Sequence, residues 1–137
     1  MSEHNLDVVR RGYEAFGRGD INALLGLFDE QISWVTPGPP ELATSGRRTG
    51  PQEVAGFFAA VNQLFDIQRF EPREFIARGD LVVVLGSETA VARSTGKVID
   101  LDWVHVFTVR NEKVAAFQEF FDTAAVVAAL SAAQAAA

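Results

Sequence analysis

Residues 103–121 read WVHVFTVRNEKVAAFQEFF, two apolar runs on either side of the polar segment Arg110–Lys113. Aromatic and β-branched residues around a short polar turn predict a β-hairpin. Each run carries one group that can transfer protons, His105 in the first and Glu119 in the second. A buried polar group without a partner costs about 1–3 kcal/mol, so each of these side chains needs a partner and can be the other's. A histidine facing a carboxylate in an apolar cavity is a candidate acid/base site.

The length of the turn decides whether the two side chains meet. A two-residue loop places His105 opposite Gln118, which sends the Glu119 carboxylate to the other face of the sheet. A three-residue loop, Arg110–Glu112, places His105 opposite Phe117 and brings His105 and Glu119 to one face. It requires a positive φ at its last residue, where glycine would be easier. We favour the three-residue loop.

The composition indicates one folded domain over residues 1–137. The chain is 48% apolar, contains 11 phenylalanines and carries a net charge of −6. Nucleic acids and anionic membranes both attract clustered basic residues, so this charge argues against them as partners. Without cysteine the chain has no disulfide and no cysteine-bound zinc. No apolar stretch approaches the roughly 20 residues of a membrane span, and the first residues lack signal-peptide features, so we expect a cytoplasmic protein.

Periodicity and turn residues predict an α+β fold. Apolar residues at helical spacing and capping signals predict helices at about 5–17, 20–28 and 51–65. Strands are expected at 31–35, 70–77, 81–93, 98–110 and 113–121, and a last helix follows Asp122. Pro72 interrupts its strand, which predicts an edge or a bulge there. Four consecutive strands after the helices favour a curved antiparallel sheet wrapped around helices, which would leave a conical cavity for a small molecule.

Several stretches resemble one protein superfamily. They are VRRGYEAF at 9–16 followed by Gly19-Asp20, Trp34 with Pro37-Gly38, FEPREFIARGDLVVVLG at 70–86, and DWVHVFTVRNEKVAAFQEFFDTAAV at 102–126. Together they are similar to the SnoaL-like polyketide cyclase and ketosteroid isomerase-like branch of the nuclear transport factor 2-like superfamily. The resemblance implies a cystatin-like conical α+β barrel. The same scaffold carries isomerases, cyclases, epoxide hydrolases and proteins without known activity, so it implies the fold more firmly than the function.

The resemblance also implies roles for individual residues. In the polyketide cyclases a histidine on the penultimate strand and an acid on the last strand line the pocket, and the acid acts as the base; His105 and Glu119 match these positions. The oxyanion tyrosine of ketosteroid isomerase falls about one residue from Tyr13. The position nearest its general base is Thr36, which cannot act as a base. Steroid isomerisation by that mechanism is therefore not expected for this chain.

Each candidate residue also has a structural interpretation. His105 can be a core histidine bonded to backbone or to Tyr13, and Glu119 can face solvent beside Gln118. Asp122 precedes a helix and is suited to cap it, an interaction worth about 1 kcal/mol, although it is also a candidate ligand contact. Aromatic side chains can form plain core or the wall of a pocket for a cyclic ligand, and the aromatic candidates for such a wall are Trp34, Phe16, Phe57, Phe58 and Trp103.

The residues lead to one main functional hypothesis and two alternatives. The main one is a cofactor-free and metal-free acid/base isomerase, cyclase or lyase acting on an apolar cyclic or carbonyl substrate, with Glu119 as base and with His105 and Tyr13 assisting. One alternative is a ligand-binding or dimeric interaction module without turnover. The other is an epoxide hydrolase-like enzyme, which would need further carboxylates in the pocket. Strands that are apolar on both faces predict a homodimer formed through the sheet.

Overall fold

The computed structural model describes residues 2–131, and its helices and strands follow the predicted order apart from one additional strand. The helices are α1 (Ser2–Gly17), α2 (Ile21–Leu25), α3 (Pro51–Leu64) and α4 (Thr123–Leu130). The strands are β1 (Phe28–Thr36), β2 (Gly46–Thr49), β3 (Phe65–Arg78), β4 (Leu81–Ala92), β5 (Val98–Arg110) and β6 (Lys113–Phe120). The prediction missed β2, which lies inside the expected proline–glycine loop, and extended the second helix into the start of β1.

The six strands form one curved sheet in the order β2-β1-β6-β5-β4-β3. Strands β3 to β6 are an antiparallel meander, as predicted. The sheet as a whole is mixed, however, because β1 pairs with β6 in parallel. No hairpin joins these two strands, so connectivity does not force them to be antiparallel. Pro72 lies on the edge strand β3 beside a register shift, which confirms the expected edge and bulge.

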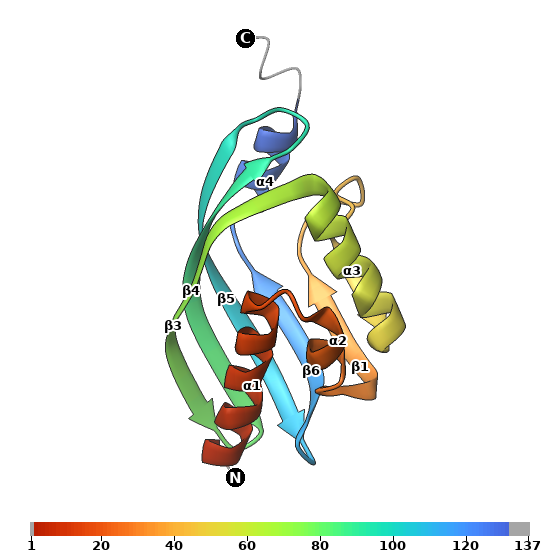
Figure 1. The fold of residues 1–137 in the computed structure, drawn as a ribbon, viewed down its shortest axis with the longest axis vertical. Helices are drawn as coiled ribbons and strands as arrows, with labels where there is room; N and C mark the ends of the chain where they lie inside the picture. The colour runs from red at the N-terminus through yellow and green to blue at the C-terminus, as the bar shows by residue number, and fades with distance from the viewer. Residues whose placement is uncertain (1, 132–137) are drawn as a thin grey trace.

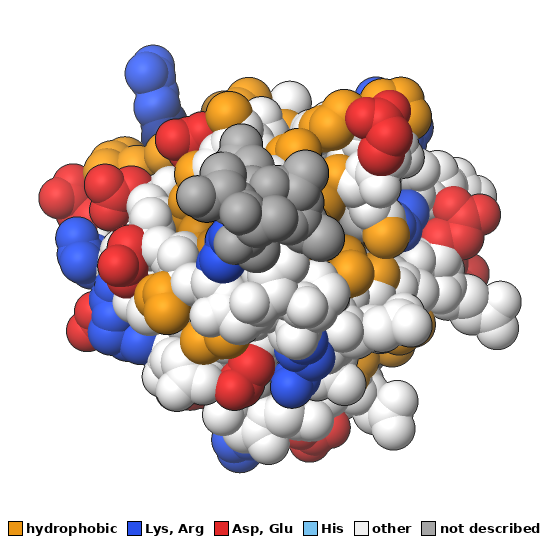
Figure 2. All heavy atoms as spheres, turned by 90° about the horizontal axis from the view of Figure 1, so that it is seen from above, with side chains coloured by type: hydrophobic (Ala, Val, Ile, Leu, Met, Phe, Trp, Pro, Cys, Tyr) orange, Lys and Arg blue, Asp and Glu red, His pale blue; other side chains and the backbone are white. Residues whose placement is uncertain are grey.

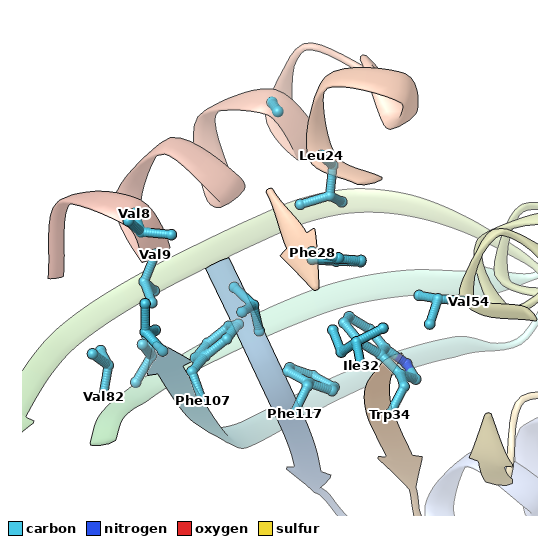
Figure 3. Packing of buried hydrophobic residues seen from close by; sticks show 14 of the residues in the cluster. Val8, Val9, Leu24, Phe28, Ile32, Trp34, Val54, Val82, Phe107 and Phe117 are labelled. Carbon is cyan, nitrogen blue, oxygen red and sulfur yellow. The ribbon is translucent and has the colours of Figure 1, made fainter. Parts of the chain in front are cut away.

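The helices cover the concave face of the sheet and enclose the core. Figure 1 shows α1 and α2 in front of the sheet, α3 at one side and α4 at the end near the turn between β4 and β5. Val8 and Val9 of α1 and Val54 of α3 are almost fully buried against the sheet (Figure 3). Apolar surface that is removed from water stabilises a fold by about 25 cal/mol per Å², and this burial holds the helices on the sheet.

The β5–β6 hairpin has a two-residue turn, and the three-residue loop that we favoured is wrong. Asn111 and Glu112 both have positive φ, 51° and 63°, and Arg110 pairs with Lys113. These are the features of a type I′ turn, whose twist matches that of the strands. A bulge then leaves Ala115 out of the pairing and shifts the register by one residue. His105 consequently lies directly opposite Glu119.

The surface carries charges of both signs. Seen from the α4 end, acidic and basic side chains are interspersed with apolar ones (Figure 2). In the part of the chain that the structure describes, no helix is long and apolar enough to cross a membrane.

Candidate active site

An apolar cavity opens between the helices and the concave face of the sheet. Its volume is about 140 Å³. A dry apolar cavity of about 150 Å³ is known to hold one benzene ring, so this space suits a ligand of about one ring. Most lining residues are aliphatic or aromatic, and the titratable ones are Tyr13, Glu88, His105 and Glu119. Such a cavity, apolar with a few convergent polar groups, is the usual form of a small-molecule site.

Three of these polar groups form a continuous hydrogen-bonded chain. The Tyr13 hydroxyl lies 2.7 Å from His105 Nδ1, and His105 Nε2 lies 3.0 Å from Glu119 Oε2. The His105 and Glu119 side chains are only 7% and 13% exposed, whereas their neighbour Gln118 is exposed. The expected contact between His105 and Glu119 is therefore present. The hydrogen bond to Tyr13 that is expected of a core histidine is also present, and both bonds involve the same imidazole ring.

The chemistry of the partners sets the direction of each hydrogen bond. A carboxylate only accepts hydrogen bonds, so the N–H at His105 Nε2 donates a hydrogen bond to Glu119. In a neutral imidazole Nδ1 is then an acceptor, and the Tyr13 hydroxyl donates to it. Burial, and to a lesser degree the negative charge of Glu119, raises the pKa of Tyr13 above its ordinary value, so this hydroxyl keeps its proton. The second carboxylate oxygen of Glu119, Oε1, has no hydrogen-bond partner among residues 2–131 and stays available to a ligand.

Aromatic rings hold the His105 imidazole in place. The Trp103 indole stacks on it with ring centroids 3.9 Å apart and an interplanar angle of 13°. Phe117 meets the same ring nearly edge-on at 4.9 Å. The imidazole is packed between these rings in an orientation in which both nitrogens face their partners. An acid/base group held by its surroundings in this way is suited to catalysis.

The structure divides the aromatic candidates into two groups. Trp34, Phe16, Phe57 and Phe58 line the cavity, and Trp34 also stacks on Phe117 at 3.8 Å. Trp103 does not line it: the indole is 2% exposed and lies behind His105, in the space left by a glycine on the neighbouring strand. Its place is thus that of a support for His105.

Asp122 also lies outside the cavity lining. Its side chain accepts a hydrogen bond of 3.1 Å from the backbone N–H of Ala125, which caps α4. A backbone N–H in the first turn of a helix has no partner within the helix, and the Asp122 carboxylate supplies one here. The capping interpretation is confirmed.

One lining residue, Glu88, was missed by the sequence reasoning. Its side chain enters the cavity from β4, between Phe70 of β3 and Leu101 of β5, which are its cross-strand neighbours. Burial and the charge of Glu119 raise the pKa of Glu88 to about 7, and Arg69 opposes this shift. The signal was present in the sequence, because Glu88 continues the inward-facing alternation of the fully buried Val82 and Val84.

Residues 2–131 contain no group of three or more His, Asp or Glu side chains arranged to hold a metal ion. Thr36, the position that the resemblance aligns with the base of ketosteroid isomerase, is buried, and its hydroxyl donates to the backbone oxygen of Thr44.

Comparison with known proteins agrees with this architecture. Residues 9–117 match the family model described as the SnoaL-like domain. The chain belongs to the SnoaL-like domain family. A comparison with curated proteins finds no match. Among solved structures, the SnoaL-like chain is similar to an NTF2-like protein from Burkholderia xenovorans LB400, with 34% identity, a TM-score of 0.87 and coverage of 96% of this chain and 98% of that one.

Two further structures extend the comparison. An NTF2-like protein of unknown function from Burkholderia pseudomallei K96243 is 33% identical, with a TM-score of 0.88 and coverage of 96% and 100% of the two chains. TerC, co-crystallised with polyporic acid, is 30% identical, with a TM-score of 0.84 and coverage of 93% and 98%. The NTF2-like fold of this SnoaL-like protein is thereby established along nearly its whole length.

Proposed function

We propose that this chain is a single-domain, cofactor-free acid/base enzyme that moves a proton next to a carbonyl group of a small cyclic substrate. The observation that carries the proposal is the series of hydrogen bonds from Tyr13 through His105 to Glu119, which ends on a free carboxylate oxygen in an apolar cavity. Glu119 is the base. His105 fixes the position of this carboxylate, and Tyr13 fixes the tautomer of His105. A positioned acid/base group of this kind contributes about 10²–10⁴-fold to rate.

The known ligand of a similar protein supports a small organic substrate. TerC was co-crystallised with polyporic acid, and it is 30% identical to this chain. A thermal-shift screen with cyclic ketones, aromatic polyketide fragments, steroids and terpenoid epoxides would select the substrate class. A ligand at a hundredfold excess over its Kd stabilises the fold by about 2.7 kcal/mol, which such a screen detects readily.

The proposal is tested by Glu119→Gln. The glutamine carbonyl can still accept the proton of His105 Nε2, but it cannot act as a base. With the substrate chosen by the screen, we expect kcat to fall by about 10²–10⁴-fold while the Kd changes by less than about threefold. Glu14→Gln is the control, because Glu14 is exposed on the same helix as Tyr13. Turnover that survives in Glu119→Gln would remove Glu119 from the mechanism and favour a binding module.

A second candidate function, epoxide ring opening, is favoured by one observation. It requires more than one carboxyl group in the pocket, and Glu88 is a second one beside Glu119. The product distinguishes the two functions, because an epoxide hydrolase forms a diol and an isomerase forms a product of the same mass as its substrate.

We further propose that two copies of the chain associate through the convex face of the sheet. The middle part of this face is apolar and only partly covered, with Ile76 51% and Phe120 47% exposed. Between these two residues the apolar surface is continued by the half-buried Val83, Leu85, Val104 and Val106. The exposed Glu74 and Gln118, which pair with Leu85 and Val106, bound it on either side. Contiguous apolar surface of this kind is typical of protein–protein contacts. Toward the β4–β5 turn the same face carries Arg69, Thr89 and Asp100, a polar rim for the interface.

A further inference from the structure

The cavity contains one carboxyl group that lies outside the hydrogen-bonded chain of the candidate site. Glu88 projects into the cavity from β4, and it makes no hydrogen bond or ion pair with any residue between 2 and 131. Its cross-strand neighbours, Phe70 and Leu101, are apolar cavity residues. A buried charge is costly unless it is paired, so the ionised form of Glu88 requires a positive partner that these neighbours do not supply.

The titratable groups around the cavity make its interior negative. Glu119 of β6 contributes a second carboxyl group, whereas no lysine or arginine is among the lining residues that the structure describes. Tyr13 of α1 and His105 of β5 are bonded to one another and to Glu119. The lining residues from α2, α3 and α4 are apolar. Burial, together with the charge of Glu119, raises the pKa of Glu88 to about 7.

Arg69 of β3 does not supply the missing positive charge. Its side chain lies on the convex face of the sheet, where the guanidinium donates hydrogen bonds to the hydroxyl groups of Ser87 and Thr89. It lowers the pKa of Glu88 to some extent, but it forms no ion pair with this carboxyl group. A positive partner for Glu88 therefore has to come from a ligand.

Aromatic rings complete the surroundings of Glu88. Phe16 of α1 meets Phe70 of β3 with ring centroids 5.0 Å apart and an interplanar angle of 61°. It meets Phe58 of α3 at 5.9 Å and 43°, and all three rings line the cavity. The face of an aromatic ring attracts a cation, and cages of several rings are a usual site for quaternary ammonium groups. A neutral ligand gains neither this attraction nor that of the two carboxyl groups.

We propose that the cavity binds a small organic cation of about one ring, with its positive charge beside the Glu88 carboxylate and against the aromatic rings. An organic cation combines a charge that pairs with Glu88 and an apolar body that suits the rest of the cavity wall. The inference rests on the proposed function, because it assigns a charge to the substrate of the same cavity. Glu119 keeps its role as the base, and Glu88 is a binding residue.

The titration of Glu88 gives the binding a direction in pH. With a pKa of about 7, Glu88 is mostly protonated at pH 6 and mostly ionised at pH 8.5. A cation favours the ionised form, so its binding displaces the proton of Glu88 and its affinity rises with pH. A cation that binds only the ionised form gains about tenfold in affinity between these two pH values.

N-methylpyridinium and toluene test the inference without turnover. Each has one aromatic ring and one methyl group, so they share a shape and differ by one positive charge. NMR titration at pH 6 and pH 8.5 gives the Kd of each ligand. In wild-type protein we expect the Kd of N-methylpyridinium to fall about tenfold from pH 6 to pH 8.5 and that of toluene to change by less than about twofold.

The variant Glu88→Gln keeps the shape of the side chain and removes its charge. Because glutamine resembles the protonated form, we expect Glu88→Gln to bind N-methylpyridinium about tenfold more weakly than wild type at pH 8.5, without the rise in affinity with pH. Toluene is expected to bind this variant as it binds wild type. Glu74→Gln, which removes an exposed carboxylate of β3, is the control and behaves as wild type.

Three results would overturn the inference. They are a Kd of N-methylpyridinium that is independent of pH in wild type, a tenfold pH dependence that persists in Glu88→Gln, and failure of N-methylpyridinium to bind at pH 8.5. Should Glu88→Gln not fold, calorimetry of wild type at pH 7 in phosphate and in Tris decides, because the ionisation enthalpies of the two buffers differ. We expect release of about half a proton for each N-methylpyridinium bound, and binding without proton release would contradict the role of Glu88.

The same measurements separate this inference from the proposed function. Glu119→Gln is expected to bind N-methylpyridinium at pH 8.5 while losing turnover. If binding of the cation does not depend on Glu88 but turnover depends on Glu119, only the charge assigned to the substrate is wrong. If binding of the cation depends on Glu88 but turnover survives in Glu119→Gln, only the proposed function is wrong.

Discussion

At the scale of single residues, the orientation of His105 depends on a glycine of the neighbouring strand. Gly86 of β4 pairs with Trp103 of β5. A Cβ atom at Gly86 would lie 2.4 Å from two carbons of the Trp103 ring and 2.6 Å from the backbone oxygen of Glu71. Only glycine therefore leaves room for the indole that stacks on His105.

We expect Gly86→Ala to lower the free energy of unfolding by about 1–3 kcal/mol, because overpacking displaces either the indole or the edge strand. Chemical denaturation measures this change. Gly56→Ala is the matched control: Gly56 lies in α3 with no atom near its Cβ position, and alanine in a helix stabilises by about 0.5–1 kcal/mol. A Gly86→Ala protein as stable as wild type would contradict the close contact.

At the scale of elements, α4 closes one end of the cavity and is held at both of its ends. Asp122 caps its first turn, and Thr95 of the β4–β5 turn donates a hydrogen bond of 2.5 Å to the backbone oxygen of Ala129. Lys97 from the same turn donates to the backbone oxygen of Ser131 at 3.2 Å, where a positive charge suits the C-terminal end of a helix. Val126 of this helix lines the cavity.

Asp122 therefore contributes to stability through its cap. Asp122→Ala is expected to lower the free energy of unfolding by about 1 kcal/mol, whereas Asp122→Asn changes it little, because asparagine caps a helix about as well as aspartate. Thermal or chemical denaturation of the two variants measures the difference. Equal destabilisation by both substitutions would show that the negative charge, and not the cap, is what matters.

The elements also show the limit of reasoning from the sequence. Apolar alternation located β3 to β6 to within a few residues at most ends, because half-buried strands leave a two-residue period in the sequence. The predicted length of the β5–β6 turn was wrong, and the bulge that follows the turn was not predicted, because a bulge is not visible in the two-residue period of the sequence. Ala115 lies outside the pairing, and this extra residue brings Glu119 opposite His105 despite the two-residue turn.

At the scale of the whole molecule, the sheet has one face under the helices and one face turned outward. The apolar part of the convex face includes Phe120, which is 47% exposed. Apolar surface buried between two copies would stabilise a dimer in the same way that the concave face holds the helices. The proposed association is thus a property of the folded sheet and not of any single strand.

We expect wild-type protein to sediment as a dimer and Phe120→Lys to sediment as a monomer at the same concentration, because a charge at the apolar contact costs more than the contact gains. Sedimentation equilibrium distinguishes the two states. Val98→Lys is the control, since Val98 is 64% exposed at the far end of β5. A monomeric wild type, or a dimer that tolerates Phe120→Lys, would rule out this interface.

The sequence by itself determined the order of the elements, the curved meander and the presence of one histidine and one carboxylate on neighbouring strands, because periodicity and turn chemistry are local properties of the chain. The alternation of inward and outward side chains along β4 also indicates that Glu88 faces inward. Only the tertiary structure decided that Tyr13 of α1 completes the chain through His105 to Glu119, that β1 pairs in parallel with β6, and that Trp103 supports His105 from behind. These contacts join residues far apart in sequence, and their geometry depends on bulges, helix packing and free space that local patterns do not encode.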